Sequence, residues 1–366
     1  MDSSPFNGIK CQTVDVTHSQ PGEESDMKIS RIGIDLAKNV FQVHGVDRNG
    51  KAVVRRQLRR QQMKMYFAGL EPCLVGMEAC GSAHYWAREL GTLGHTVRLM
   101  APQFVKPYVK SGKNDANDAE AICEAVGRPS MRFVTVKTVA QHGTQAVHRI
   151  RSRLVRARTA LANEIRGLLA EWGVIIPVHL GSVRRALPEI LENAENGLTS
   201  DFRVLVQELW KELRALDERV TRYDARLEDW ARADARVQRL LAIEGIGIIS
   251  ATALVSAVGD GRQFKTGREL AAWIGLTPSQ HSSGGKNRLG HISKRGDGYV
   301  RTLLIHGARA ALRAAQVKQK QDGRSRWVTA LAARRHVNIA TVALANKNAR
   351  IAWALLSREE DYRCAR

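Results

Sequence analysis

Four carboxylates are the residues of this chain best suited to chemistry. Asp35 lies inside the apolar run 32–36, and Glu78 ends a second apolar run. Asp115 and Asp118 are three residues apart in a helix-like segment, so both should lie on one helix face. Clustered acids repel one another at neutral pH, and Mg²⁺, which prefers oxygen ligands, compensates for this repulsion. Two such ions could activate a nucleophile and stabilise a leaving oxygen during phosphodiester exchange.

Each acid also has a simpler interpretation. A single Asp after a strand is often a loop or cap residue, and Asp115 could cap its own helix. The ordered combination favours a metal site: Gly-Ile-Asp on a first strand, a Glu ending an apolar strand, then Asp-x-x-Asp on a helix. Glu120 points to a different helical face from Asp118 and is left out of the cluster.

The elements expected around the acids form an α/β sheet. Apolar patterning predicts strands at 32–36, 40–46, 52–54, 73–77 and 95–100, and helices at 83–93 and 114–122. The first three strands are expected to be antiparallel, and the strand–helix–strand unit that follows implies a parallel pair. If the first and fourth strands are neighbours, as in a ribonuclease H-like sheet, Asp35 and Glu78 lie side by side.

The charge balance favours a nucleic-acid partner. Lys and Arg number 57 against 36 Asp and Glu, and the sequence pI is about 10.3. Such a surface concentrates polyanions, although a merely soluble or ribosome-like basic protein would share the composition. A dense strip at the start of a long helix favours an RNA or DNA backbone over a solvated face; it contains Arg149, Arg151, Arg153, Arg156 and Arg158.

A second unusual stretch, 282–297, combines serines, glycines and bases. Its small residues let the backbone approach a phosphate, and nearby side chains could bind neighbouring phosphates: Lys286, Arg288, Lys294, Arg295 and Arg301. An exposed serine here could be a nucleophile, but from the residues alone a phosphate-binding or flexible loop is the simpler interpretation. His281 and His291 are possible bases, or simply polar or phosphate-contacting residues.

Gly245 and Gly247 separate two apolar segments. This pattern resembles the turn of a helix-hairpin-helix module, whose backbone amides contact a phosphate at a helix start. The alternative is a connection between helices that needs glycine for a positive φ. The basic stretch that follows favours phosphate contact.

The middle of the chain has helical periodicity. Apolar residues recur at steps of three and four from Ile150 to Trp172 and again from Val206 to Leu241, with a slip near Ala233. Pro177, Gly181, Pro188 and Gly197 indicate an irregular connection between these seams. The pattern predicts a long helical arm, and either packing within one subunit or dimerisation would explain it.

Cysteine usage and hydropathy limit the remaining classes. Five scattered cysteines form no CxxC pair, so neither a disulfide framework nor a zinc site is indicated. No secretory signal or membrane-length apolar run is present, because Lys347 and Arg350 break the longest candidate, 339–356. We therefore expect a soluble, intracellular protein with no membrane partner and a disordered extension over residues 1–29.

Four motifs carry a family resemblance. Ile32-Gly-Ile-Asp-Leu-Ala-Lys-Asn-Val, Gly76-Met-Glu-Ala-Cys-Gly-Ser, Lys113-Asn-Asp-Ala-Asn-Asp-Ala-Glu and Gly275-Leu-Thr-Pro-Ser-Gln-His-Ser-Ser-Gly-Gly closely resemble the DEDD transposases of the insertion sequence 110 family, 1111 subgroup. The resemblance implies a RuvC-like (ribonuclease H-like) α/β domain over 30–140, a helical coiled-coil arm over 141–241, and a mainly helical transposase domain over 242–366. The last would hold the helix-hairpin-helix-like motif and a catalytic serine.

The resemblance also implies roles for residues. The family's RuvC-like acids correspond to Asp35, Glu78, Asp115 and Asp118, with Mg²⁺ as cofactor. Its catalytic serine corresponds to Ser283, although Gly-Gly replaces the Gly-Ser of some members and Ser282 is the adjacent alternative. Ser283 would attack a phosphodiester to form a phosphoserine link to DNA, and a 3′-hydroxyl of the other DNA would complete the exchange.

Partners follow from the same resemblance. They are donor and target DNA, a structured noncoding guide RNA, and further copies of the chain in a homodimer or homotetramer; the protein would be bacterial, cytoplasmic and nucleoid-associated during activity. Two other interpretations remain. A RuvC-like structure-selective nuclease would need the acids and water but not Ser283, and a non-enzymatic basic protein would use neither.

Overall fold

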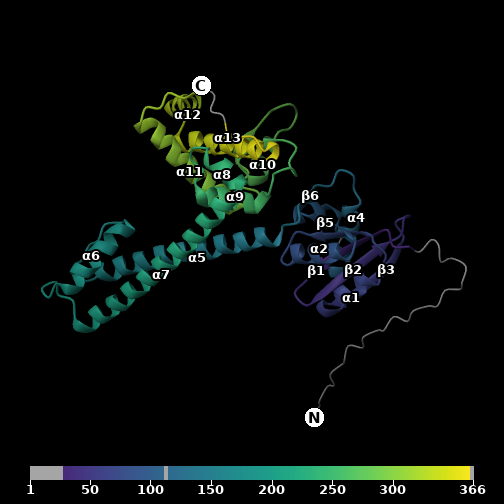
Figure 1. The fold of residues 1–366 in the computed structure, drawn as a ribbon, viewed down its shortest axis with the longest axis horizontal. Coiled ribbons are helices and arrows are strands. Elements are labelled where there is room, and N and C mark those ends of the chain that lie inside the picture. Colours follow the sequence, from purple (N-terminus) through teal and green to yellow (C-terminus); the bar gives the residue numbers. More distant parts are fainter. Residues whose placement is uncertain (1–27, 111–113, 363–366) are drawn as a thin grey trace, which may run out of the picture. The chain divides into compact units, whose positions relative to one another are not determined.

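The computed structural model describes residues 28–110 and 114–362, and the chain divides into two compact units, 1–136 and 137–366. Most of the predicted disordered extension lies outside the described residues. In the part that the structure describes, the first unit is a mixed α/β sheet with helices, and the second unit is mostly helical (Figure 1). This division agrees with the predicted α/β region followed by helices.

The six strands described in the first unit form one sheet in the order β3-β2-β1-β4-β5-β6. Their bounds are β1 Arg31–Leu36, β2 Val40–Val46, β3 Ala52–Arg59, β4 Leu74–Glu78, β5 Thr96–Met100 and β6 Phe133–Val134. β1, β2 and β3 are antiparallel neighbours and β4 is parallel to β5, as predicted. β4 is also parallel to β1, which makes the first and fourth strands neighbours. β3 is longer than expected because its second half, which is mostly Arg and Gln, shows no apolar alternation.

Helices cover both faces of this sheet. Ile32, Ile34, Phe41 and Met77 pack with Trp86 in the core beneath α1 (Met63–Ala68) and α2 (Ala83–Thr92). α4 (Asp115–Val126) contacts β1, β2 and β4 and contributes to a smaller core. Short helical turns complete the unit: η1 Arg60–Gln62, α3 Pro102–Val105 and η2 Lys106–Tyr108.

Two glycines let α4 lie close to the sheet. A β-carbon on Gly33 would stand 2.3 Å from the carbonyl oxygen of Ala119, and one on Gly76 would stand 2.7 Å from the β-carbon of Val126. Both distances are shorter than real side chains permit, so any larger residue would push the helix away. The two glycines therefore fix the height of α4 above β1 and β4.

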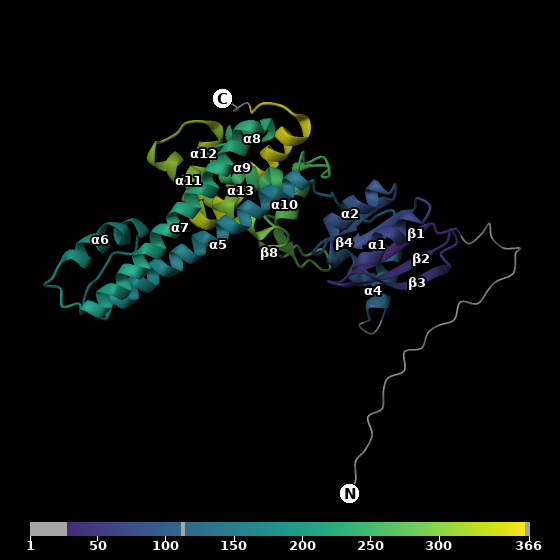
Figure 2. The ribbon, with the colours of Figure 1, turned by 60° about the horizontal axis from the view of Figure 1, so that its bottom comes forward.

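Three helices of the second unit form an arm with its own core. They are α5 Val139–Ala170, α6 Leu180–Glu192 and α7 Ser200–Ala233. Arg151 pairs with Asp224 and Arg158 with Asp217, so α5 and α7 run antiparallel (Figures 1 and 2). The predicted seam therefore has a partner within the chain. α7 ends at Ala233, where the sequence pattern slips.

Two expectations about the arm are wrong in detail. The connection between the seams contains α6, with Pro188 inside it, because Val183 and Leu187 are buried in the arm core and favour the helix despite the proline. The predicted seam of α5 includes Leu168, but Leu168 is 38% exposed. Near the end of the helix the buried position is that of Leu169, which is fully buried.

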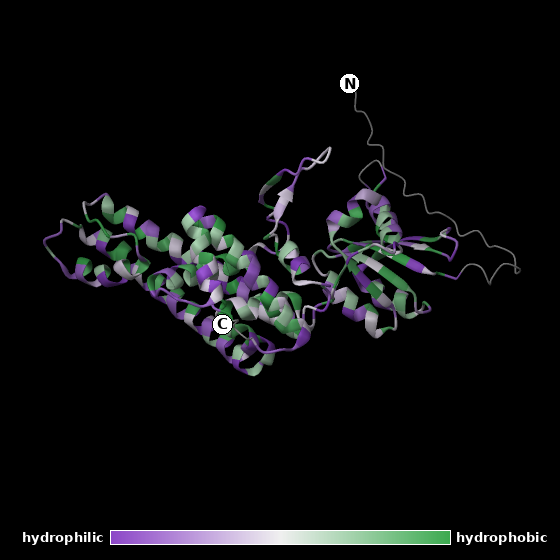
Figure 3. Cartoon of the chain, turned by 90° about the horizontal axis from the view of Figure 1, so that it is seen from above, coloured by the Kyte–Doolittle hydropathy of each residue, from purple (hydrophilic) through white to green (hydrophobic). Residues whose placement is uncertain are grey.

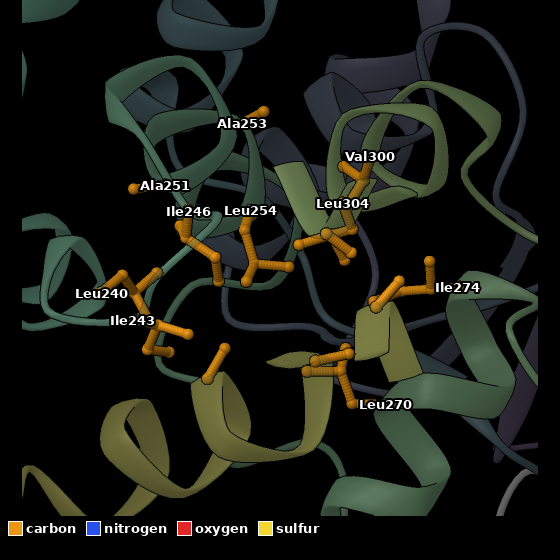
Figure 4. Packing of buried hydrophobic residues seen from close by; sticks show 14 of the residues in the cluster. Leu240, Ile243, Ile246, Ala251, Ala253, Leu254, Leu270, Ile274, Val300 and Leu304 are labelled. Carbon is orange, nitrogen blue, oxygen red and sulfur yellow. The ribbon is translucent and has the colours of Figure 1, made fainter. Parts of the chain in front are cut away.

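The rest of the second unit has a separate core. Its helices are α8 Ala235–Leu241, α9 Ile248–Val258, α10 Gly267–Ile274, α11 Gly298–Val317, α12 Gly323–Arg334 and α13 Val337–Arg358. Leu240, Ile243, Leu254, Leu270 and Leu304 meet in this core (Figure 4). Most of these helices carry both hydrophobic and hydrophilic residues along their length (Figure 3), as helices with one buried side do, whereas α9 is buried from Ser250 to Val258. No described helix is both long and apolar enough to span a bilayer.

A β-hairpin interrupts these helices. β7 (Pro278–Gln280) pairs with β8 (Leu289–Ile292), and the sequence pattern had indicated only a Gly-rich loop here (Figure 2). The hairpin contains both candidate serines.

Candidate active site

Strand register places Asp35 and Glu78 side by side. Ile34 pairs with Met77 in the parallel β1–β4 ladder, and Asp35 and Glu78 are the next residues on their strands. Side chains alternate along a strand, so these two acids share a face with Gly33 and Gly76, the face covered by α4. The neighbouring first and fourth strands thus produce the juxtaposition that the sequence pattern suggested.

The start of α4 supplies two more acids. Asn114 caps this helix, its side-chain oxygen accepting from the backbone nitrogen of Ala116 at 3.1 Å. Asp115 is therefore not the cap, and both it and Asp118 lie in the first turn. Ligand oxygens of Asp35, Asp115 and Asp118 all lie within 4.8 Å of one another. Glu78 is outside this group, although its carboxylate is close enough to interact with Asp35 and Asp118.

The surroundings of the cluster disfavour the charged forms of two of its carboxylates. Burial, followed by repulsion from Asp118 and Asp115, raises the pKa of Asp35. Burial, followed by repulsion from Asp35 and Asp118, raises the pKa of Glu78. A carboxylate-only donor set that resists ionisation fits a hard divalent cation, which would favour the charged forms.

Glu120 is not part of the cluster, as its helical position predicted. Its carboxylate pairs with Lys110 at 2.5 Å, and that hydrogen bond is the main reason its pKa is lowered. Lys110 is thus paired with an acid outside the cluster.

The hairpin presents Ser283 at its tip. The backbone nitrogen of Lys286 donates to the carbonyl of Ser283 at 3.0 Å, and Gly284 and Gly285 have φ angles of +55° and +77°. Two consecutive positive φ angles define a two-residue turn that glycine adopts without strain. The Gly-Gly pair that departs from the family spelling is therefore what the turn requires.

The two serines differ in their contacts. The Ser282 hydroxyl accepts from the side-chain nitrogen of Gln280 at 2.8 Å and from the backbone nitrogen of Arg288 at 3.2 Å. Ser283 is exposed, and within the described part of the chain its hydroxyl has no hydrogen-bond partner. Ser282 thus helps to hold the hairpin together, whereas Ser283 is accessible.

The basic residues near the hairpin fall into two groups. Lys286, Arg288, Lys294 and Arg295 are exposed. Arg301 is partly buried, and its guanidinium donates to the carbonyls of Ile274 at 2.8 Å and Arg295 at 3.1 Å. Arg301 therefore ties the hairpin base to α10, a role that the sequence did not indicate.

The two glycines between α8 and α9 also differ. Gly245 has φ of +87°, and a β-carbon there would stand 2.6 Å from the carbonyl oxygen of Gly307 in α11. Close packing thus accounts for Gly245. Gly247 precedes α9 as its cap residue and faces open space. Phosphate contact at this turn stays a prediction.

The five arginines of α5 do not form one strip. Arg149, Arg153 and Arg156 are exposed and lie on one side of the helix, whereas Arg151 and Arg158 pair with acids of α7. A helix turns by about 100° per residue, so closely spaced residues can lie on opposite sides. The continuous strip was therefore wrong, and three arginines remain available to a partner.

A basic chain that combines a carboxylate cluster on an α/β sheet with a helical unit and an accessible serine belongs to the class of DNA-processing enzymes. Two family models match it: a DEDD-type model described as Transposase over residues 32–173, and Transposase IS116/IS110/IS902 family over residues 237–323.

Curated relatives agree. The chain is 60% identical to a probable family 20 transposase of Pseudomonas aeruginosa, over 92% of this chain and 99% of that protein. It is 49% identical to the transposase for insertion sequence element IS1111A of Coxiella burnetii, over 93% and 92%. It is also 41% identical to the transposase for IS1328 of Yersinia enterocolitica, over 90% and 97%. The chain therefore belongs to the IS110 family of transposases, and its substrate class is DNA.

Proposed function

We propose that this transposase inserts and excises its element by serine attack on DNA, assisted by Mg²⁺ and guided by a structured noncoding RNA. The observation that carries the proposal is the combination, in one chain, of the carboxylate group around Asp35 with an exposed serine at a hairpin tip. An enzyme that only activates water would have no use for the serine.

The strand order supports a RuvC-like assignment of the first unit. β1 lies between antiparallel β2 and parallel β4, with acids on β1, at the end of β4 and in the first turn of α4. We take this as a ribonuclease H-like arrangement over residues 30–140, followed by the arm over 141–241 and the transposase domain over 242–366.

In this proposal the Ser283 hydroxyl oxygen attacks phosphorus, the Oγ–P bond forms, and the bond to the 3′-oxygen breaks, so the leaving strand ends in a 3′-hydroxyl. The hydroxyl proton passes to that leaving oxygen. A 3′-hydroxyl of the second DNA then reverses these bond changes and frees the serine. Asp35, Glu78, Asp115 and Asp118 would hold Mg²⁺, which when bound offsets negative charge that develops on the phosphate oxygens.

A covalent adduct tests the serine. Wild-type protein with Mg²⁺, guide RNA and donor DNA should form an SDS-resistant protein–DNA complex, and Ser283→Ala should form none. Ser282→Ala is the matched control: it loosens the hairpin, so the adduct should form more slowly but still form. Strand cleavage by Ser283→Ala at the wild-type rate would instead support the structure-selective nuclease.

RNA that co-purifies with the protein tests the guide. Arg149, Arg153 and Arg156 are the exposed cations of α5 that we assign to its backbone. Sequencing should recover one structured RNA, and adding it back should restore strand exchange. An active preparation without specific RNA would remove the guide. Light scattering on the RNA complex should give the mass of a dimer or tetramer.

A further inference from the structure

The edge strand β3 carries a row of polar side chains in register with the acid cluster. Gln57 on β3 pairs with Gln42 on β2, and Gln42 pairs with Asp35 on β1. These three residues therefore form one line across the sheet. Neighbouring strands lie about 4.8 Å apart, so Gln57 stands about 10 Å from Asp35 across the sheet.

Alternation along β3 assigns two arginines to the same face. Leu58 is buried in the core beneath α1 and α2, so Arg55, Gln57 and Arg59 point to the opposite face, where Asp35 lies. All three are exposed. We call them the β3 strip.

The arginines on the other face of the strand and just beyond its end contact groups within the fold. The Arg56 guanidinium lies 5.3 Å from the ring centre of Tyr66. Arg60, just beyond the strand, lies 5.3 Å from the ring of Trp86 and donates to the carbonyl of Lys38 at 3.4 Å. These arginines cover aromatic side chains of the fold.

The arginines of the β3 strip have no such role. Neither Arg55 nor Arg59 forms an ion pair within the described residues of the chain. Arg55 interacts electrostatically with Glu120, which is itself paired with Lys110. Two exposed cations thus flank Gln57 on a face whose neighbouring site is acidic.

A polyanion needs such cations here. Four carboxylates repel a DNA strand, and bound metal offsets this repulsion only at the phosphate that it contacts. Phosphates one or two nucleotides away need their own partners, and guanidinium groups and amides bind phosphate oxygens without reading the bases.

We propose that Arg55, Gln57 and Arg59 bind the backbone of the DNA strand whose reacting phosphodiester lies at the acid cluster. The strip consists of positioning residues and is independent of base sequence. This inference rests on the proposed function insofar as the acids act on DNA, but binding itself can be measured without any reaction.

The test compares two faces of one strand in full-length protein. Arg55→Gln and Arg59→Gln, singly and together, are measured against Arg56→Gln, which removes the same charge from the opposite face. Fluorescence anisotropy with labelled donor DNA is recorded over a range of salt concentrations, in parallel with single-turnover adduct formation at increasing DNA concentration. Thermal melting verifies that each variant folds, and Arg59→Lys tests whether charge alone restores binding.

The double variant should bind donor DNA about 10- to 100-fold more weakly, and the slope of log affinity against log salt should fall by about two, one for each lost phosphate contact. Adduct formation should need more DNA but reach nearly the wild-type rate at saturation. Arg56→Gln should leave both slope and rate unchanged, and Arg59→Lys should recover most of the binding.

Three results would overturn the proposal that the β3 strip binds the DNA backbone. They are wild-type salt dependence in the double variant, an equal loss in Arg56→Gln, or a loss confined to guide-RNA binding. Asp35→Asn separates this inference from the proposed function. If Asp35→Asn still forms the adduct normally, the metal-assisted mechanism is wrong, whatever the β3 strip binds. If Asp35→Asn loses the adduct while the double variant binds DNA normally, only the proposed role of the β3 strip is wrong.

Discussion

The Nδ1 atom of His148 lies 3.1 Å from the hydroxyl oxygen of Tyr299, and its Nε2 atom lies 3.1 Å from the hydroxyl oxygen of Thr252. This buried ring joins α5 to α11 and α9. Burial, with a smaller contribution from Arg151, lowers the pKa of His148 from 6.5 to about 4. The three residues are far apart along the chain, so no local sequence pattern predicts this contact.

We expect this histidine to make the fold sensitive to acid. Its folded pKa lies below its unfolded pKa, so the unfolded chain binds the proton more readily, and stability falls as pH drops from about 6.5 towards 4. At about 1.36 kcal/mol per pKa unit, the full loss is roughly 3 kcal/mol. Urea unfolding at pH 7 and pH 5 should show about 2 kcal/mol of this loss. His148→Gln should be less stable at pH 7 but lose less on acidification; an equal loss would contradict the assignment.

Asp35→Asn should stabilise the metal-free protein. The pKa of Asp35 is raised in the folded state, so ionising it as pH rises through its ordinary value of 3.8 costs stability. Removing the charge should raise the melting temperature without Mg²⁺, abolish the rise that Mg²⁺ produces in wild type, and reduce adduct formation at least about a hundredfold. Glu120→Gln is the matched control and should keep the Mg²⁺ response.

Side chains on Gly284 or Gly285 should impair the reaction without unfolding the protein. Both residues have positive φ, which costs a residue with a β-carbon about 1–2 kcal/mol. The hairpin tip is exposed, so Gly284→Val and Gly285→Val should lower the melting temperature by only a few degrees while slowing adduct formation at least about tenfold. Gly181→Ala, where a β-carbon meets open space, is the control. Unchanged rates would mean that the turn does not position Ser283.

The two sides of α5 should respond differently to the same substitution. Arg151→Gln with Arg158→Gln removes pairs to α7 and should cost about 1 kcal/mol of stability. Arg149→Gln, Arg153→Gln and Arg156→Gln together should leave stability unchanged but weaken RNA binding and reduce its salt dependence. Chemical denaturation and filter binding distinguish the two sets. Equal effects on RNA would show that helix face is irrelevant.

What the sequence could predict was mostly local. The strands and the α4 helix follow from apolar patterns, but the pairing of β1 with β4, which places Asp35 beside Glu78, was expected only on the condition of a ribonuclease H-like strand order. The β7–β8 hairpin could not be predicted, because a run of Ser, Gly and Lys has no alternation and its turn depends on two φ angles. Pro188 indicated an irregular connection instead of α6, because the burial of α6 against the rest of the arm cannot be predicted from local sequence. The partners of Arg151 and Arg158 depend on which residues α7 brings opposite them.

Gly33→Ala should disable the site although every acid remains. The added methyl group would meet backbone atoms of α4 at 2.3 Å, so the helix must move away and carry Asp115 and Asp118 with it. Overpacking of this kind costs about 1–3 kcal/mol. We expect a lower melting temperature, loss of the Mg²⁺-induced rise and little adduct. Gly91→Ala, which meets no neighbour, should behave as wild type.

The spacing of the carboxylates is thus set by two positions that have no side chain at all. A mutated copy of the gene that keeps all the reactive residues would be judged intact if only those residues were inspected. For proteins built like this one, that criterion is insufficient: a copy with all four acids and the serine, but with an alanine or valine in place of Gly33 or Gly76, is expected to be immobile. Surveys of such copies should score these glycines together with the acids.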